Sequence, residues 1–299
     1  MIKTTWEDSK KTMDWLPVAA ILGAVFLWGS SFCTMRIVLE DLSPMGVLCC
    51  RYFIAFICII PISKKIIPKT IHKGDWKIII SMALFQPCLY FLFESNALTY
   101  TTSSQAGIIS ACLPLMVAVA ARIFLFETLK IKTIIGLMLS ITGVIFLTAF
   151  QSSQPQASNP VLGNLLEVGA MASACAYMIL IKHLSSRYSA WTLTGFQVTA
   201  GMIFFLPGII DVLSANSDIW QFKLICLLIF LGAGVSLTAF ALYNWGISKI
   251  EASTASVFIN LIPVTAIFLG WIVLGETLNQ AQSIATAVVI AGVFISSRN

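Results

Sequence analysis

The chain has 299 residues, of which 58% are hydrophobic and 10% are charged, and its formal net charge is +5 at pH 7. Soluble domains carry roughly 25% charged residues, so this composition excludes a soluble globular domain and indicates a chain that lies mostly in lipid. The basic residues are spread among short segments rather than gathered in one patch, which argues against nucleic acid as a partner.

The apolar runs of the chain predict an all-α membrane protein. Residues 1–15 form a charged tail, and we interpret the run that follows as a retained span because no small-residue cleavage site lies close behind it. The polar segment 151–161 is expected to be a periplasmic linker between two halves, 16–150 and 162–296. Runs of about 20 residues are long enough to cross a hydrocarbon core. The ten predicted transmembrane helices are 16–38, 44–63, 76–97, 103–125, 131–150, 162–183, 190–211, 222–247, 252–274 and 280–296.

The two halves repeat one another. A shift of 149 positions lays 97–146 on 246–295 without a gap, and twelve of the fifty pairs are identical. The identities include Pro114 with Pro263 and the string Glu127-Thr128-Leu129 with Glu276-Thr277-Leu278. A repeat in so apolar a chain is typical of secondary transporters, which predicts two five-helix repeats around a central cavity.

Basic residues set the expected orientation. With the N-terminus inside, fifteen of the eighteen lysines and arginines fall in cytoplasmic segments, which lysine and arginine favour. Both termini are therefore expected in the cytoplasm of a multi-pass protein. An odd number of spans in each half then requires the second half to run upside down, so the repeats are predicted to be inverted.

Several short strings resemble the drug/metabolite transporter superfamily, in its ten-span EamA branch. They are Leu27-Trp28-Gly29-Ser30-Ser31-Phe32, Arg51-Tyr52-Phe53-Ile54-Ala55, and Ala97-Leu98 through Pro114 to Glu127-Thr128-Leu129, with the last recurring from Ile250 to Leu278. Together they cover nearly all of the chain in order. The resemblance implies a carrier of small metabolites in the cell inner membrane, often an exporter of amino acids or related compounds. Uptake of a nucleoside-like or S-adenosylmethionine-like solute is the alternative that it leaves open.

Three ionisable residues lie at membrane depth, where a charge is costly unless it is paired or faces water. Arg51, Glu94 and Glu167 all fall in the outer half of their predicted spans. They are candidates to bind a zwitterionic solute, and the two carboxylates are candidates to carry a coupled proton. The alternative is a structural ion pair or side chains that reach the interface.

Further polar and aromatic side chains within spans are candidates to line the cavity, as stacking walls or as groups that orient a solute. A hydrogen bond to a neighbouring helix is the alternative for each of them. Positions that differ between the halves, such as Glu94 opposite Tyr243, are where specificity should lie. The candidates are Trp28, Gln86, Tyr90, Tyr177, Tyr243, Asn244 and Asn260.

The shared residues are interpreted as scaffold. Pro114 and Pro263 occupy equivalent places and are expected to kink or hinge their helices, with a static kink as the alternative. Glu127 and Glu276 are interpreted as turn or helix-cap residues at the joints between spans.

No motif indicates an enzyme, a metal or a cofactor. The eight cysteines form no CxxC pair, and the sequence holds no Walker loop or nucleophile motif. We therefore expect a secondary active transporter of small polar metabolites, such as amino acids or amines, that works by alternating access in the direction of export. The expected partners are the solute, a coupled proton and the lipid bilayer, and the protein is expected to be a monomer or homodimer. A membrane enzyme or a sensor is the weaker alternative, since no polar catalytic cluster or soluble domain supports it.

Overall fold

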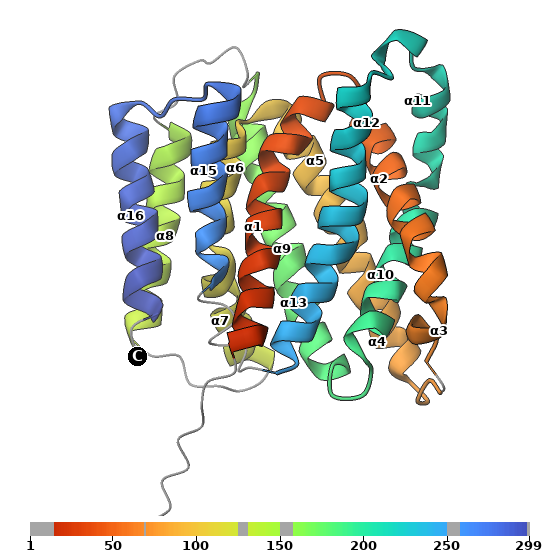
Figure 1. The fold of residues 1–299 in the computed structure, drawn as a ribbon. Coiled ribbons are helices and arrows are strands. Elements are labelled where there is room, and N and C mark those ends of the chain that lie inside the picture. Colours follow the sequence, from red (N-terminus) through yellow and green to blue (C-terminus); the bar gives the residue numbers. More distant parts are fainter. Residues whose placement is uncertain (1–14, 69, 125–130, 150–157, 250–257, 298–299) are drawn as a thin grey trace, which may run out of the picture.

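The protein is a bundle of helices, and the described residues contain no strand (Figure 1). The computed structural model describes residues 15–68, 70–124, 131–149, 158–249 and 258–297. The predicted all-α fold is therefore confirmed.

The first half contains five helical segments in chain order, some of them interrupted. They are α1 (Trp15–Val38); α2 (Pro44–Ile59) with η1 (Ile60–Ile62) and α3 (Ser63–Ile66); α4 (Asp75–Ala83), η2 (Leu84–Leu89) and α5 (Tyr90–Tyr100); α6 (Ser103–Ser110) and α7 (Leu113–Phe124); and α8 (Ile131–Ala149).

The second half repeats this order. Its helices are α9 (Pro160–Leu184); α10 (Ala190–Phe205), η3 (Leu206–Gly208) and α11 (Ile209–Ser214); η4 (Ser217–Ile219); α12 (Phe222–Ile229), η5 (Phe230–Ala239) and α13 (Phe240–Ile247); α15 (Leu261–Leu274); and α16 (Gln280–Ser297).

Within the described ranges, seven helical segments, of 22 to 26 residues, are long and apolar enough to cross a membrane. Three further apolar helices are shorter, at Ile134–Phe146, Leu261–Leu274 and Gln280–Gly292. These three fall on the fifth, ninth and tenth predicted spans. That these spans cross the membrane stays a prediction.

Polar caps fix where several helices begin. Ser43 accepts a hydrogen bond from the Gly46 N–H ahead of α2, and Ser189 accepts one from the Thr192 N–H ahead of α10. The Asn159 side chain caps α9 in the same way, with Pro160 at the first helical position, where the missing N–H costs nothing. These residues mark where α2, α10 and α9 begin.

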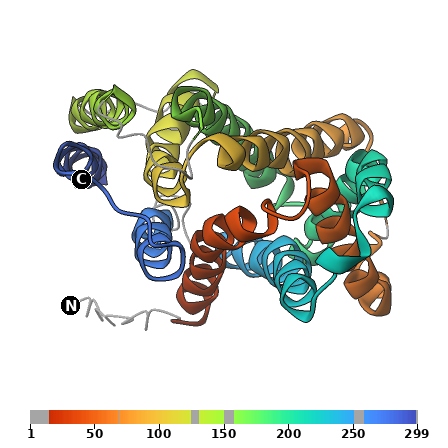
Figure 2. The same cartoon turned by 90° about the horizontal axis from the view of Figure 1, so that it is seen from above.

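The helix contacts repeat with the halves exchanged. The α5 helix packs on α9, and α13 packs on α1; α1 packs on α15, and α9 packs on α6 and α7. Three pairs join corresponding helices of the two halves: α2 with α10, α6 with α15, and α8 with α16. The α8 and α16 pair lies at one edge of the bundle, beside the remaining helices (Figure 2). This pattern is what a two-fold relation between halves produces.

The direction of the chain shows that the relation is an inversion. Arg36, near the end of α1, donates from Nη1 to the Leu98 carbonyl at 2.5 Å, so α1 and α5 end together. The Asn159 N–H, at the start of α9, donates to the carbonyl of Tyr100 at 3.3 Å. The second half thus begins at the end of the bundle where the first helix of the chain finishes, the upper end in Figure 1.

Glu276 ties the halves together at that upper end. Its carboxylate accepts from the N–H groups of Ser103 and Ser104, both at 2.8 Å, and from both hydroxyls, at 3.0 and 2.5 Å. Gly270 leaves room for the carboxylate, because a Cβ there would lie 2.5 Å from Glu276 Oε2. Glu276 therefore caps α6 of the other half rather than a helix at its own joint between spans, whereas Glu127 lies outside the described residues.

A second contact joins the halves at the lower end. Asp75 Oδ1 lies 2.7 Å from Arg187 Nη1, and the Tyr188 hydroxyl donates to Asp75 Oδ2 at 3.0 Å. The same hydroxyl accepts from the His72 N–H at 3.0 Å. The loop before α4 is thus attached to the connection between α9 and α10.

Candidate functional site

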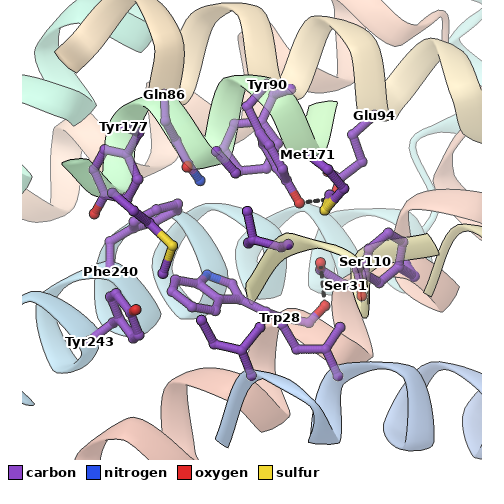
Figure 3. A pocket seen from close by; sticks show the side chains of 17 residues that line it. Trp28, Ser31, Gln86, Tyr90, Glu94, Ser110, Met171, Tyr177, Phe240 and Tyr243 are labelled. Carbon is purple, nitrogen blue, oxygen red and sulfur yellow. Dashed lines mark hydrogen bonds between the residues drawn. The ribbon is translucent and has the colours of Figure 1, made fainter. Parts of the chain in front are cut away.

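A cavity lies between the halves and is lined by seventeen of the described residues (Figure 3). We call it the central cavity. Its walls come from α1, the η2 to α5 segment, the junction of α6 and α7, α9, α13 and the start of α15. Both halves contribute, as the sequence predicts for a central cavity. Six predicted site residues line it: Trp28, Gln86, Tyr90, Glu94, Tyr177 and Tyr243.

Glu94 supplies the charged group of this lining. It projects from α5 and is 1% exposed. Its Oε1 accepts a hydrogen bond from the Tyr90 hydroxyl, one helical turn earlier, at 2.7 Å. Its Oε2 is buried and has no hydrogen-bond partner. A buried carboxylate oxygen without a partner is costly, so this atom is ready to accept a bond from a ligand.

Aromatic rings form the facing wall. The Trp28 ring lies 4.9 Å from the Tyr243 ring and 5.3 Å from the Phe240 ring, between centroids. The Trp28 Nε1 and the Tyr243 hydroxyl are buried without a hydrogen-bond partner. This wall therefore presents apolar faces together with two unused polar groups (Figure 3).

Interruptions of two helices bring polar groups to the lining. Gln86 leaves helical geometry inside the π-helical segment η2, with φ −145° and ψ 115°, just before Pro87, which has no N–H to donate. The α6 and α7 helices meet at a turn, where the Ala111 and Cys112 N–H groups bond to carbonyls only three residues earlier. Pro114 lies directly after this turn, and Pro263 directly after the equivalent turn at Asn260.

Arg51 does not line the central cavity. It is fully buried on α2, where its Nε donates to the Ser236 hydroxyl and its Cζ lies 4.0 Å from the centroid of the Phe91 ring. Its Nη1 and Nη2 have no hydrogen-bond partner, and no described carboxylate forms a salt bridge with them. Because Phe91 itself lines the cavity, the guanidinium lies one layer behind the wall.

Glu167 also lies behind the lining. It is fully buried on α9, and neither of its carboxylate oxygens has a hydrogen-bond partner. It is close enough to Glu94 for the two charges to repel each other, and Glu94 in turn feels the charge of Arg51. The three predicted ionisable residues thus form one electrostatic group, of which Glu94 alone reaches the cavity.

The two predicted asparagines lie outside the lining as well. Asn244 accepts from the Tyr177 hydroxyl at 2.8 Å and donates to Thr194 at 2.9 Å and Gln197 at 3.2 Å. These bonds satisfy its amide and hold Tyr177 in place, which is the alternative role that the sequence left open. Asn260 is the turn residue ahead of α15, and its Oδ1 has no partner.

Sequence reasoning missed much of the rest of the lining, most of it apolar. Missed residues include Ser31, Phe91, Ser110, Met171, Met178 and Phe240. The repeat itself carries a usable signal, because the lining residues Ser110 and Leu113 map by the shift of 149 onto Ile259 and Ile262, which also line the cavity. No group of three or more metal-ligating side chains occurs among the residues that the structure describes.

Two inverted repeats of apolar, membrane-length helices around a buried cavity define a multi-pass protein with the architecture of a membrane carrier. A family model, the EamA-like transporter family, matches residues 15–149 and 161–298. The chain belongs to this family, within the drug/metabolite transporter superfamily, and is a membrane transporter.

Relatives and a solved structure agree with this assignment. The chain is similar to the uncharacterized transporter YetK of Bacillus subtilis, with 25% identity covering 93% of this chain and 85% of the relative. An uncharacterized transporter of Archaeoglobus fulgidus is 28% identical, covering 92% of this chain and 96% of the relative. One crystal structure matches with a TM-score of 0.64 at 17% identity, covering 93% of this chain and 95% of the other, and so shows the fold.

Proposed function

We propose that the protein is a secondary active carrier that moves small polar metabolites, such as amino acids or amines, across the bacterial inner membrane in the direction of export. The observation that carries this proposal is the central cavity, which lies between the inverted repeats and holds buried polar atoms without partners. In carriers with inverted repeats, the solute site lies near the bilayer midplane at the repeat interface. The direction rests on the family resemblance, and the basic loops support cytoplasmic termini.

Alternating access requires the two ends of the cavity to open in turn. The halves are joined at the upper end by Glu276 with Ser103 and Ser104, and at the lower end by Asp75 with Arg187. Rocking of one bundle against the other separates one of these contacts while the other stays closed. The turns before Pro114 and Pro263 lie in matching helices beside the cavity, and they are the points at which we propose that these helices bend.

The carboxylate pair supports coupling to a proton. Glu94 and Glu167 are buried and repel one another, so the pair holds one proton more readily than it holds two negative charges. When a solute neutralises the charge of Glu94, the pair no longer requires that proton and can release it. This exchange would link solute movement to the proton gradient.

Transport by the purified protein in sealed vesicles tests the proposal. We expect a labelled amino acid or amine to enter protein-containing vesicles faster than empty ones, and a pH gradient to drive its accumulation. Glu167→Gln is expected to abolish the effect of the gradient while solute exchange at equal pH persists. Glu40→Gln, at an exposed glutamate, is the matched control.

Three results would contradict parts of this proposal. If no labelled amino acid or amine enters the vesicles faster than it enters empty ones under any gradient, the carrier proposal is rejected. An unchanged response to the gradient in Glu167→Gln would reject the proton pair. Selective accumulation of a nucleoside-like or S-adenosylmethionine-like solute, driven inward, would replace export by uptake.

A further inference from the structure

We propose that the central cavity selects solutes that carry an amine and an aromatic or apolar body but no carboxylate. This inference rests on the proposed carrier function and names the class of solute for the same site. It separates amines from amino acids, which the family resemblance and the topology leave together.

The charges at the cavity favour a cation. Glu94 is the only residue with a formal charge in the lining formed by the described residues, and its Oε2 has no partner. No lysine or arginine is part of that lining. One guanidinium, Arg51, stands against two carboxylates, Glu94 in the cavity wall and Glu167 behind it, so the group is neutral while the pair holds one proton and carries one excess negative charge once that proton has left. A solute ammonium at Oε2 would neutralise that charge.

The same arrangement disfavours a carboxylate. A solute carboxylate would have to lie beside the buried Glu94 carboxylate, where the two like charges repel more strongly than they would in bulk water. Arg51 does not offer the compensating bond, because the Phe91 ring, 4.0 Å from its Cζ, belongs to the cavity wall. For an amino acid, the repulsion between its carboxylate and Glu94 therefore offsets the attraction between its ammonium group and Glu94.

The rest of the lining fits an aromatic body. Trp28, Tyr243 and Phe240 form a wall on which a flat ring can stack and an ammonium can make cation–π contact. Met171 and Met178, both on α9, line the same space, and their flexible side chains adapt to an apolar surface. The free Trp28 N–H and Tyr243 hydroxyl are positioned to bond a neutral acceptor on the solute.

Three compounds that share one ring test the inference: phenethylamine, phenylalanine and 3-phenylpropanoate. They carry an amine, an amine with a carboxylate, and a carboxylate alone. We expect phenethylamine to raise the thermal midpoint of the purified protein and to bind at least tenfold more tightly than phenylalanine, with no shift from 3-phenylpropanoate, because a ligand of the folded state stabilises it.

The variant Glu94→Gln should weaken phenethylamine binding at least tenfold and reduce its advantage over phenylalanine. Glu40→Gln keeps the wild-type affinities and is the control for a lost surface carboxylate. The midpoint of each variant without ligand checks that it is folded.

The outcomes separate this inference from the proposed function. If phenylalanine binds as well as phenethylamine, or if phenethylamine produces no shift, the amine class is overturned, and transport of another solute in vesicles would still support the carrier. If no solute of any class moves in vesicles, the carrier itself is rejected. An amine preference that survives in Glu94→Gln would overturn the role of that carboxylate.

Discussion

Buried carboxylates in this protein differ in how they are satisfied, and the difference separates structural from functional roles. Glu276 accepts from two backbone N–H groups and two hydroxyls at the start of α6, so its charge is compensated within the fold. Glu94 has one protein partner, and Glu167 has none. A carboxylate that the fold leaves unsatisfied needs a ligand or a proton, whereas Glu276 needs neither.

Replacing Glu276 by glutamine should therefore destabilise the protein without changing which solute it prefers. The amide nitrogen of Glu276→Gln would face donors, so buried N–H groups lose their acceptor, and we expect a loss of about 1–3 kcal/mol of folding free energy. The measurement is thermal unfolding of the purified variant beside Glu40→Gln. An unchanged midpoint would mean that the cap contributes nothing to stability.

Helix contacts in the core depend on the absence of side chains at a few positions. A Cβ on Gly107 of α6 would lie 2.3 Å from the Ala266 Cβ of α15, closer than real atoms approach. On α9, a Cβ on Gly169 would meet the Phe93 ring at 3.5 Å, an ordinary contact. The close approach of α6 to α15 brings the two interrupted helices together beside the cavity.

These two glycines give a matched pair of substitutions. Gly107→Ala should destabilise the protein by about 1–3 kcal/mol, because the two helices must move apart. Gly169→Ala should be neutral or stabilise the protein by up to about 1 kcal/mol, since alanine restricts the unfolded chain and favours a helix. Thermal unfolding of both variants under one condition makes the comparison. Equal effects at the two positions would show that α6 and α15 can move apart without a loss of folding free energy.

The arrangement of the helices follows from the sequence, whereas the sequence does not show which side chains face the cavity. Repeat, apolar runs and basic loops predict inverted halves because lipid constrains every residue along the chain. The same patterns place Arg51, Glu94 and Glu167 at one membrane depth but leave the rotation of each helix open, and only Glu94 reaches the cavity. The partner of Glu276 was equally hidden, since Ser103 lies 173 positions away.

The contacts that join the halves lie at opposite ends, which makes the lower one a test of alternating access. The Asp75 carboxylate is 4% exposed and the Arg187 side chain 43% exposed, so water screens the ion pair and its contribution is about 1 kcal/mol. That energy still changes a two-state equilibrium about fivefold. Weakening the pair should raise the population in which the lower end is open.

Arg187→Gln should therefore expose the cavity to reagents from the lower face. Ala174, in the cavity lining and 4% exposed, can be changed to cysteine in a variant whose native cysteines are replaced. We expect a membrane-impermeant maleimide to label this cysteine about fivefold faster from the lower face in Arg187→Gln, and no faster from the upper face. Lys182→Gln removes an exposed positive charge from the same end of α9 and is the control. Equal labelling in the two variants would show that the lower contact holds the loops together without controlling access, and the closure would then have to come from the apolar packing of Ile79, Ile181 and Leu184 above it.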